Sequence, residues 1–245
     1  MADQITGRPF AAFDIDGTII RWQLYHALAD ELARAGCLGA IEYNAVRAAR
    51  LNWKNRHNDD GFKTYEQTLV NLVDASLTGI SVSDLQSACV QVITQYKDQV
   101  YTYTRDLFKD LQSQGYLLFA ISASQSEIVQ LLAEYYNFDD YGGSNYGTKD
   151  GYFTGENDIL VSHRKPEHLK KLVAKHRATW AGSYGVGDSE SDIPLLESVE
   201  RPLAFNPSKQ LFEHAQTAGW PVVVERKNMI YRLNSVDGTY QLITS

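Results

Sequence analysis

The stretch Phe10-Ala11-Ala12-Phe13-Asp14-Ile15-Asp16-Gly17-Thr18 decides the fold of this chain. It begins as a short apolar run and stops at an Asp-Gly-Thr turn, as a buried parallel strand does. Side chains in a strand repeat every second residue, so Asp14 and Asp16 lie on the same side, unless the turn redirects the second carboxylate. Two carboxylates so close repel each other unless a cation lies between them. The stretch therefore predicts a buried strand that ends in two carboxylates. With Asp188 brought alongside, they offer the oxygen ligands that magnesium prefers.

The segments after this strand predict an α/β fold. Residues 22–96 show helical periodicity, which turn residues divide into about four helices, and strands alternate with helices after residue 97. We expect strands at 116–121, 183–187, 202–205 and 222–224, and helices at 104–114, 124–136, 165–176, 193–198 and 208–218. Such alternation predicts a doubly wound, mostly parallel sheet with helices on both faces. Residues 1–20 and 97–245 would form this core, and residues 21–96 an inserted all-helical domain.

Three local signals complete the expected fold. Thr104 is a candidate N-cap for the first helix after the insertion. Residues 141–155 predict a hairpin with a turn at Lys149-Asp150-Gly151. Residues 228–244 predict another around Val236-Asp237-Gly238, which we favour as an extension of the sheet edge over a dimerisation element.

Composition excludes several classes of function. The net charge of −7 opposes binding to nucleic acid. The chain shows no secretory signal at its start and no apolar run long enough to cross a membrane. Cys37 and Cys89 lie far apart without a metal-ligand pattern, so neither a disulfide framework nor a zinc site is expected. A cytoplasmic protein without a membrane partner is the expected type.

Further candidate residues stand where the expected strands end, at the edge of a parallel sheet where functional groups collect. Ser122 ends a strand, Lys165 opens a helix, and Asp188 and Asp192 follow another strand. Each has a commonplace alternative: the aspartates and Ser122 as turn or helix caps, and Lys165 as a solvated lysine. Their combination with the first strand favours a catalytic site.

The combination resembles the haloacid dehalogenase superfamily, which is defined by four ordered motifs. Here they read Phe13-Asp14-Ile15-Asp16-Gly17-Thr18, Ile121-Ser122-Ala123-Ser124, Lys165, and Gly187-Asp188-Ser189-Glu190-Ser191-Asp192. The insertion directly after the first motif looks like that of the phosphoserine-phosphatase-like subclass (subfamily IB). The resemblance implies a Rossmann-like core with a helical cap.

The resemblance also implies a role for each matched residue. Asp14 would be the nucleophile, and Asp16 the acid that protonates the leaving alcohol and then activates water. Mg²⁺ would be bound by the carboxylates of Asp14 and Asp188 and by the main-chain carbonyl of Asp16. Three further roles are implied: Ser122 with the Ala123 amide and Lys165 would bind phosphate, and Asp192 would orient Lys165 or a metal-bound water.

The implied function is that of a magnesium-dependent phosphatase acting on a small-molecule phosphate monoester through an aspartyl phosphate. Asp16 separates it from a dehalogenase, because a halide leaving group needs no proton and an alkoxide does. A phosphotransferase or phosphomutase would use the same intermediate and stays an alternative. A non-catalytic phosphate-binding protein is disfavoured because the whole constellation is present. The protein could be a monomer or a homodimer.

Substrate selection would fall to the cap. Phosphoserine-specific members carry an acidic residue in the first cap helix where this chain has Gln23, which argues against phosphoserine. A phosphoserine phosphatase proper stays an alternative. Arg47 and Arg50 lie at helical spacing with Lys54 and His57, a pattern that predicts one basic face. We favour a solvated face over recognition of a second anionic group on the substrate. Three aromatic residues could line a pocket or pack in the core: Trp22, Tyr25 and Trp53.

Overall fold

The computed structural model describes residues 7–56, 61–236 and 239–243. These residues form two compact units, each described by itself. The core unit comprises Met1–Trp22, Tyr96–Ser144 and Ile159–Ser245, and the helical unit comprises Gln23–Gln95 and Asn145–Asp158.

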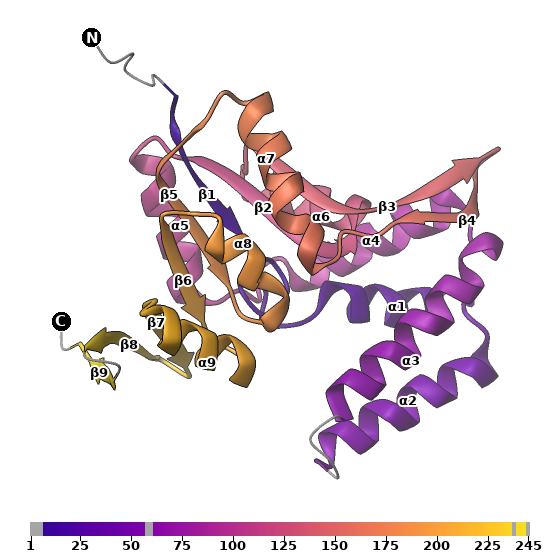
Figure 1. The fold of residues 1–245 in the computed structure, drawn as a ribbon. Coiled ribbons are helices and arrows are strands. Elements are labelled where there is room, and N and C mark those ends of the chain that lie inside the picture. The colour runs from indigo at the N-terminus through magenta and orange to yellow at the C-terminus, as the bar shows by residue number, and fades with distance from the viewer. Residues whose placement is uncertain (1–6, 57–60, 237–238, 244–245) are drawn as a thin grey trace. The chain divides into compact units, whose positions relative to one another are not determined.

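A mostly parallel sheet forms the core unit (Figure 1). Its strands in spatial order are β3 (Asp140–Lys149), β2 (Leu117–Gln125), β1 (Pro9–Phe13), β5 (Thr179–Gly187), β6 (Arg201–Phe205), β7 (Val222–Arg226), β8 (Met229–Val236) and β9 (Thr239–Leu242). The strand quoted at the outset, β1, lies between two parallel neighbours. Its last residue, Phe13, pairs with Ala120 of β2 and with Val186 of β5. Asp14 therefore emerges between two neighbouring strand ends.

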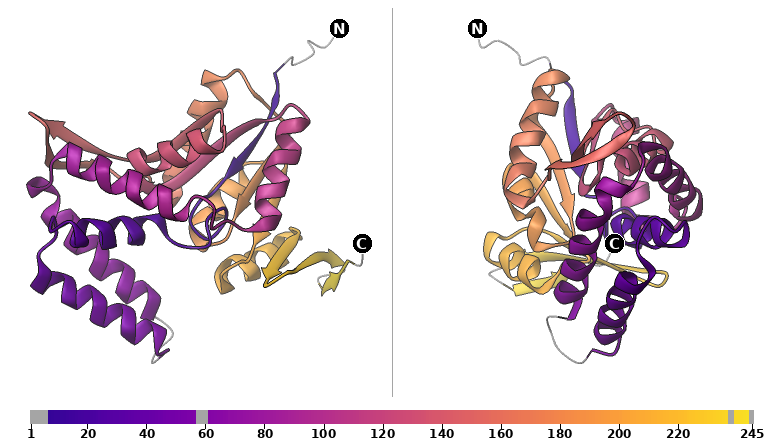
Figure 2. Two further views of the ribbon diagram at one scale, coloured as in Figure 1. Left: turned by 180° about the vertical axis from the view of Figure 1, so that it is seen from behind. Right: turned by 90° about the vertical axis from the view of Figure 1, so that its right-hand side faces the viewer.

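Helices cover both faces of this sheet, as the opposite views of Figures 1 and 2 show. They are α5 (Thr102–Ser113), α6 (Ser126–Tyr135), α7 (Lys165–Lys175), α8 (Ile193–Glu197) and α9 (Lys209–Ala218), with 3-10 turns η2 (Ser162–Arg164) and η3 (Glu190–Asp192). The predicted fold class, a doubly wound and mostly parallel α/β sheet, is confirmed.

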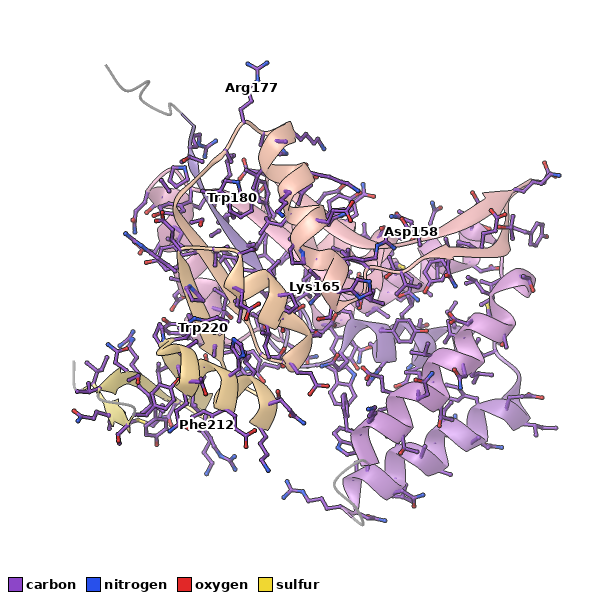
Figure 3. The ribbon with its side chains drawn as sticks, in the orientation of Figure 1. Asp158, Lys165, Arg177, Trp180, Phe212 and Trp220 are labelled. Atoms are coloured by element: carbon purple, nitrogen blue, oxygen red, sulfur yellow. The ribbon has the colours of Figure 1, made fainter. Side chains whose placement is uncertain are left out.

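Alternation along β1 explains the two layers. Phe10 and Ala12 pack in one cluster with apolar residues of α7, α8 and α9. Phe13 points to the other face and meets Phe108 of α5 edge-on, with ring centroids 6.1 Å apart. Trp180 of β5, labelled in Figure 3, meets Phe10 edge-on, with ring centroids 5.0 Å apart. Full burial of each such phenylalanine contributes about 1.5–3 kcal/mol, so β1 is held firmly from both sides.

The helical unit contains α1 (Leu24–Arg34), α2 (Ala40–Lys54), α3 (Gly61–Ser76), η1 (Leu77–Gly79) and nearly all of α4 (Val82–Tyr96). It also contains β4 (Tyr152–Asp158), which pairs with the outer half of β3. The expected helical domain, residues 21–96, did not include this hairpin. In the structure the hairpin belongs to the helical unit. The Val82 amide donates to the Gly151 carbonyl at 2.9 Å, and Ser81 forms an isolated antiparallel β-bridge with Tyr152. These contacts fix the hairpin tip to the start of α4.

Several expected element boundaries were wrong, two of them at residues singled out from the sequence. Helix α5 begins at Thr102, and the hydroxyl of Thr104 donates to the Thr18 carbonyl at 2.8 Å instead of capping the helix. Strand β2 does not end at Ser122 but runs to Gln125, which pairs with Ser144 of β3. The extension keeps Ser122 and Ser124 in one extended strand.

The C-terminal hairpin extends the sheet edge, as expected: β8 pairs antiparallel with β7, and β9 with β8. Residues 237 and 238 of its predicted turn lie outside the described residues. Tyr240 anchors the hairpin, because its hydroxyl donates to the Trp220 carbonyl at 2.9 Å and its ring lies 5.2 Å from that of Phe212. None of the helices in the described ranges combines the length and hydropathy needed to cross a membrane.

Candidate active site

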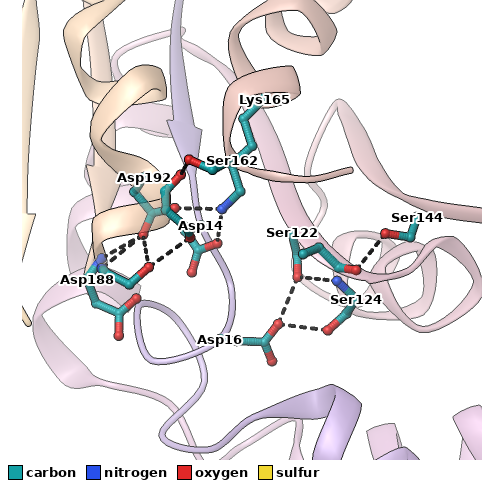
Figure 4. A network of polar contacts seen from close by, with 12 residues as sticks. Asp14, Asp16, Ser122, Ser124, Ser144, Ser162, Lys165, Asp188 and Asp192 are labelled. Atoms are coloured by element: carbon teal, nitrogen blue, oxygen red, sulfur yellow. Dashed lines mark hydrogen bonds and ion pairs between the residues drawn. The ribbon is translucent and has the colours of Figure 1, made fainter. Parts of the chain in front are cut away.

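Three carboxylates converge at the ends of β1 and β5. Asp14 follows β1, Asp188 follows β5, and Asp192 ends η3. One oxygen from each lies within 4.8 Å of the others (Figure 4). Parallel pairing of the two strands brings them together, because Phe13 and Val186 are partners in the register.

Lys165 lies buried among these carboxylates. Its ammonium group donates to Oδ1 of Asp14 at 2.9 Å and to Oδ1 of Asp192 at 2.6 Å. The lysine side chain is 2% exposed, and those of Asp14 and Asp192 are 8% and 0% exposed. A charge in such surroundings is stable only when it is paired, so Lys165 is an internal component of the site.

Asp192 is fixed through its second oxygen. Oδ2 accepts hydrogen bonds from the amides of Asp188 and Ser189, at 3.2 and 3.0 Å, and from the Ser189 hydroxyl at 3.1 Å. Gly187 lies so close that a Cβ atom there would stand 2.5 Å from that of Asp192. Asp192 therefore holds both Lys165 and the loop that carries Asp188.

The electrostatics of this cluster favour an added cation. Burial raises the pKa of Asp14, and the nearby Asp192 raises it further, while Lys165 opposes both effects. Burial also raises the pKa of Asp188, with Asp14 adding to it. Burial alone would lower the pKa of Lys165, but Asp14 and Asp192 outweigh it and raise that pKa. One ammonium group thus leaves the carboxylates with excess negative charge.

The residues present fit Mg²⁺. Their donors are carboxylate oxygens, which suit a hard cation. Gly17, with φ of +85°, leaves room for the Asp188 carboxylate, because a Cβ atom there would stand 2.1 Å from Oδ2. Asp14 and Asp188 are the expected carboxylate ligands, whereas the side chain of Asp16 is engaged elsewhere.

Asp16 is held by two serines of β2. The hydroxyls of Ser122 and Ser124 both donate to its Oδ2, at 2.8 and 2.9 Å. The strand between the two serines is held by Ser144, whose hydroxyl donates to the Ala123 carbonyl at 2.6 Å. Ala123 itself is exposed, whereas Ser122 is 1% and Ser124 3% exposed.

The candidate residues of the core unit thus form two groups of polar contacts, one around Lys165 and one around Asp16 (Figure 4). The sequence indicated no role for Ser124 beyond its place in the second motif, and no role for Ser144. The spacing Ser122-x-Ser124 could have indicated the first, because residues two apart in a strand face the same side. No local signal indicates Ser144, which lies 21 positions from its partner.

The candidate substrate-selecting residues belong to the helical unit. Arg50 is committed internally, since its guanidinium donates to both oxygens of Asp30, at 2.9 and 2.7 Å, and to the Tyr65 hydroxyl at 2.8 Å. Arg47 is exposed and lies over the Tyr43 ring at 5.4 Å. Gln23 immediately precedes α1 and is partly buried.

The other residues of the expected basic face and pocket have mixed placements. Lys54 is exposed at the end of α2, and His57 lies outside the described residues. Trp53 stacks on Tyr65 with ring centroids 5.7 Å apart, which favours packing as its role. Burial raises the pKa of the Tyr25 hydroxyl. Trp22 falls at the end of the first core segment.

Comparison with known proteins gives a family match over most of the chain. The family model for haloacid dehalogenase-like hydrolases matches residues 11–197. A histidinol-phosphatase of Neisseria meningitidis serogroup C (strain 8013) is 24% identical over 226 residues, 87% of this chain and 97% of that protein. An inhibition of morphological differentiation protein of Streptomyces azureus is 27% identical over 154 residues, 62% of this chain and 56% of that protein. The chain thus spans little more than half of this second relative.

Among solved structures, a phosphoserine phosphatase with an analogue of its phospho-aspartyl intermediate has a TM-score of 0.62 and 18% sequence identity. The match covers 91% of this chain and 95% of the other, which supports the shared fold. The predicted resemblance to the haloacid dehalogenase superfamily is confirmed by the family match.

Proposed function

We propose that this chain, which belongs to the haloacid dehalogenase-like hydrolase family, is a magnesium-dependent phosphatase for a small-molecule phosphate monoester. The observation that carries the proposal is the convergence of Asp14, Asp188 and Asp192 around the ammonium of Lys165 at two strand ends. Named relatives that act on histidinol phosphate and phosphoserine support the same reaction class.

Asp14 is the proposed nucleophile. Its carboxylate attacks phosphorus, an O–P bond forms to Asp14, and the bond from phosphorus to the leaving oxygen breaks. Asp16 gives its proton to that oxygen, so the product leaves as an alcohol. Water then attacks phosphorus and passes a proton to Asp16, and the bond to Asp14 breaks. Phosphate is released and both aspartates return to their starting states.

Mg²⁺, held by the carboxylates of Asp14 and Asp188 and by the main-chain carbonyl of Asp16, would neutralise charge between nucleophile and phosphate. Lys165 supplies a second positive charge beside Asp14, at 2.9 Å. Ser122 and the Ala123 amide would donate hydrogen bonds to phosphate oxygens. Asp192 keeps Lys165 charged and in position through its contact at 2.6 Å.

The helical unit is the proposed cap that selects the organic part of the substrate. Arg47 and Gln23 stay candidates for that contact, whereas Arg50 is taken up by Asp30 and Tyr65. A substrate that is a small metabolite and a cytoplasmic location agree with the negative net charge and with a cysteine content limited to Cys37 and Cys89.

Hydrolysis of p-nitrophenyl phosphate tests the proposal with three proteins: wild type, Asp14→Asn, and Asp106→Asn as an exposed acidic control on α5. Each is assayed with Mg²⁺ and with a chelator. Phosphate release that needs Mg²⁺, survives in the control and disappears in Asp14→Asn supports the function. Equal rates in wild type and Asp14→Asn would contradict it. Added alcohols, with product analysis, then test transfer to acceptors other than water.

A further inference from the structure

Two serines share one oxygen of the Asp16 carboxylate. Strand β2 stays extended to Gln125, so Ser122 and Ser124 face the same side. Their hydroxyls donate to Oδ2 of Asp16 at 2.8 and 2.9 Å, and both serines are almost fully buried. Neither contact depends on a flexible surface side chain.

The two serines have different second partners. The Ser122 hydroxyl oxygen also accepts from the Ser124 amide at 3.0 Å, and this serine is the proposed phosphate ligand. The Ser124 hydroxyl donates to Asp16, and no phosphate-binding role is proposed for this serine. The backbone between them is held by Ser144, which donates to the Ala123 carbonyl at 2.6 Å and accepts from the Leu160 amide at 3.0 Å.

We propose that Ser124 is a positioning residue that fixes the orientation of the Asp16 carboxylate during phosphate-ester cleavage. This inference rests on the proposed function. When the Ser122 hydroxyl turns to a phosphate oxygen, Ser124 keeps Oδ2 anchored. With Oδ2 anchored, Oδ1 is the oxygen that carries the proton to the leaving group.

The consequence depends on the leaving group. As the bond between phosphorus and an alkyl oxygen breaks, Oδ1 of Asp16 gives its proton to that oxygen and an alcohol leaves. A nitrophenolate is stable enough to leave without the proton. Loss of the anchor therefore slows alkyl esters much more than nitrophenyl esters.

The test compares kcat on an alkyl phosphate and on p-nitrophenyl phosphate for wild type, Ser124→Ala and Ser124→Thr. Ser183→Ala is the matched control, because Ser183 is fully buried in β5 and its hydroxyl accepts from the Glu200 amide at 3.1 Å. Positioned acids contribute about 10²–10⁴-fold, so a misaligned acid should raise the aryl-to-alkyl ratio by about tenfold or more. We expect this in Ser124→Ala, with the ratio restored in Ser124→Thr and unchanged in Ser183→Ala.

The outcomes separate this inference from the function beneath it. A wild type that cleaves neither ester contradicts the proposed function itself. An active wild type whose ratio is unchanged in a folded Ser124→Ala protein contradicts only the positioning role. If Ser124→Ala does not fold, Ser124→Cys serves instead, because a thiol has similar size and is a weaker donor. Its ratio should also rise, and an unchanged ratio would again overturn the role.

Discussion

Replacement of Lys165 by methionine should strongly destabilise the core unit. The ammonium lies 2.9 Å from Asp14 and 2.6 Å from Asp192, and all three side chains are at most 8% exposed. Removal of one partner from a buried ionic group leaves uncompensated charge and costs about 3–5 kcal/mol. We therefore expect the free energy of unfolding to fall by about this amount in the absence of Mg²⁺.

Urea unfolding followed by far-UV circular dichroism measures this loss. The matched control is Lys171→Met on the same helix, whose side chain is 67% exposed and pairs with Glu167 across one helical turn. Such surface pairs contribute under about 1 kcal/mol. Mg²⁺ should restore part of the stability of Lys165→Met, and more than it adds to wild type, because a cation compensates the same carboxylates. Lys165→Arg, which keeps the charge, should lie between the two.

An unfolding free energy for Lys165→Met within about 1 kcal/mol of that for Lys171→Met would refute this reasoning. It would mean that the buried carboxylates do not depend on the lysine.

Three further predictions concern other parts of the two units. Arg50→Ala should destabilise the chain by about 2 kcal/mol, because charged hydrogen bonds such as those to Asp30 contribute about 1.5–3 kcal/mol. Arg47→Ala should cost far less. Equal losses of unfolding free energy in urea would contradict the internal role of Arg50. Gly17→Ala should abolish most activity, because the new Cβ atom meets the Asp188 carboxylate. Gly36 also has a positive φ but open space around it, so Gly36→Ala should cost about 1 kcal/mol of stability and keep turnover. Burial lowers the pKa of His26 from 6.5 to about 4, and Arg50 adds to this effect. As the pH falls, the imidazole therefore binds a proton in the unfolded chain before it does so in the folded chain. Stability from His26 is therefore present above pH 6.5 and lost as pH falls towards about 4, by about 3 kcal/mol in total. A His26→Phe variant that keeps the full pH dependence would exclude this origin.

Much of the core could be predicted because its signals are local. The apolar run before Asp14 and the Gly-Asp turn at Asp188 mark strand ends, and parallel pairing then brings the two carboxylates together. The other candidate residues, including Lys165, were predicted from the order of the motifs. The neighbours of Lys165 in sequence give no sign that it is buried.

What could not be predicted depends on partners far along the chain. Helix α5 begins two residues before Thr104, where its first amides meet the Glu225 carboxylate: the Tyr103 amide donates to Oε2 at 2.8 Å, across 122 positions. The spacing of Arg50 in the sequence indicates a solvated basic face. In the structure, however, Arg50 donates to Asp30 of α1. The local pattern also cannot show that residues 145–158 join the helical unit, because η1 and the start of α4 provide the contacts.

The most direct test of the central claim is to trap the phosphorylated enzyme. Protein mixed with substrate and Mg²⁺ is quenched with borohydride, which reduces an acyl phosphate to an alcohol, and the modified residue is identified by peptide mass spectrometry. Conversion of Asp14 alone, absent without substrate, is the predicted result, because its carboxylate is the proposed nucleophile beside Lys165. Modification of another carboxylate, or an unmodified Asp14 in protein that is turning over substrate, would contradict the claim.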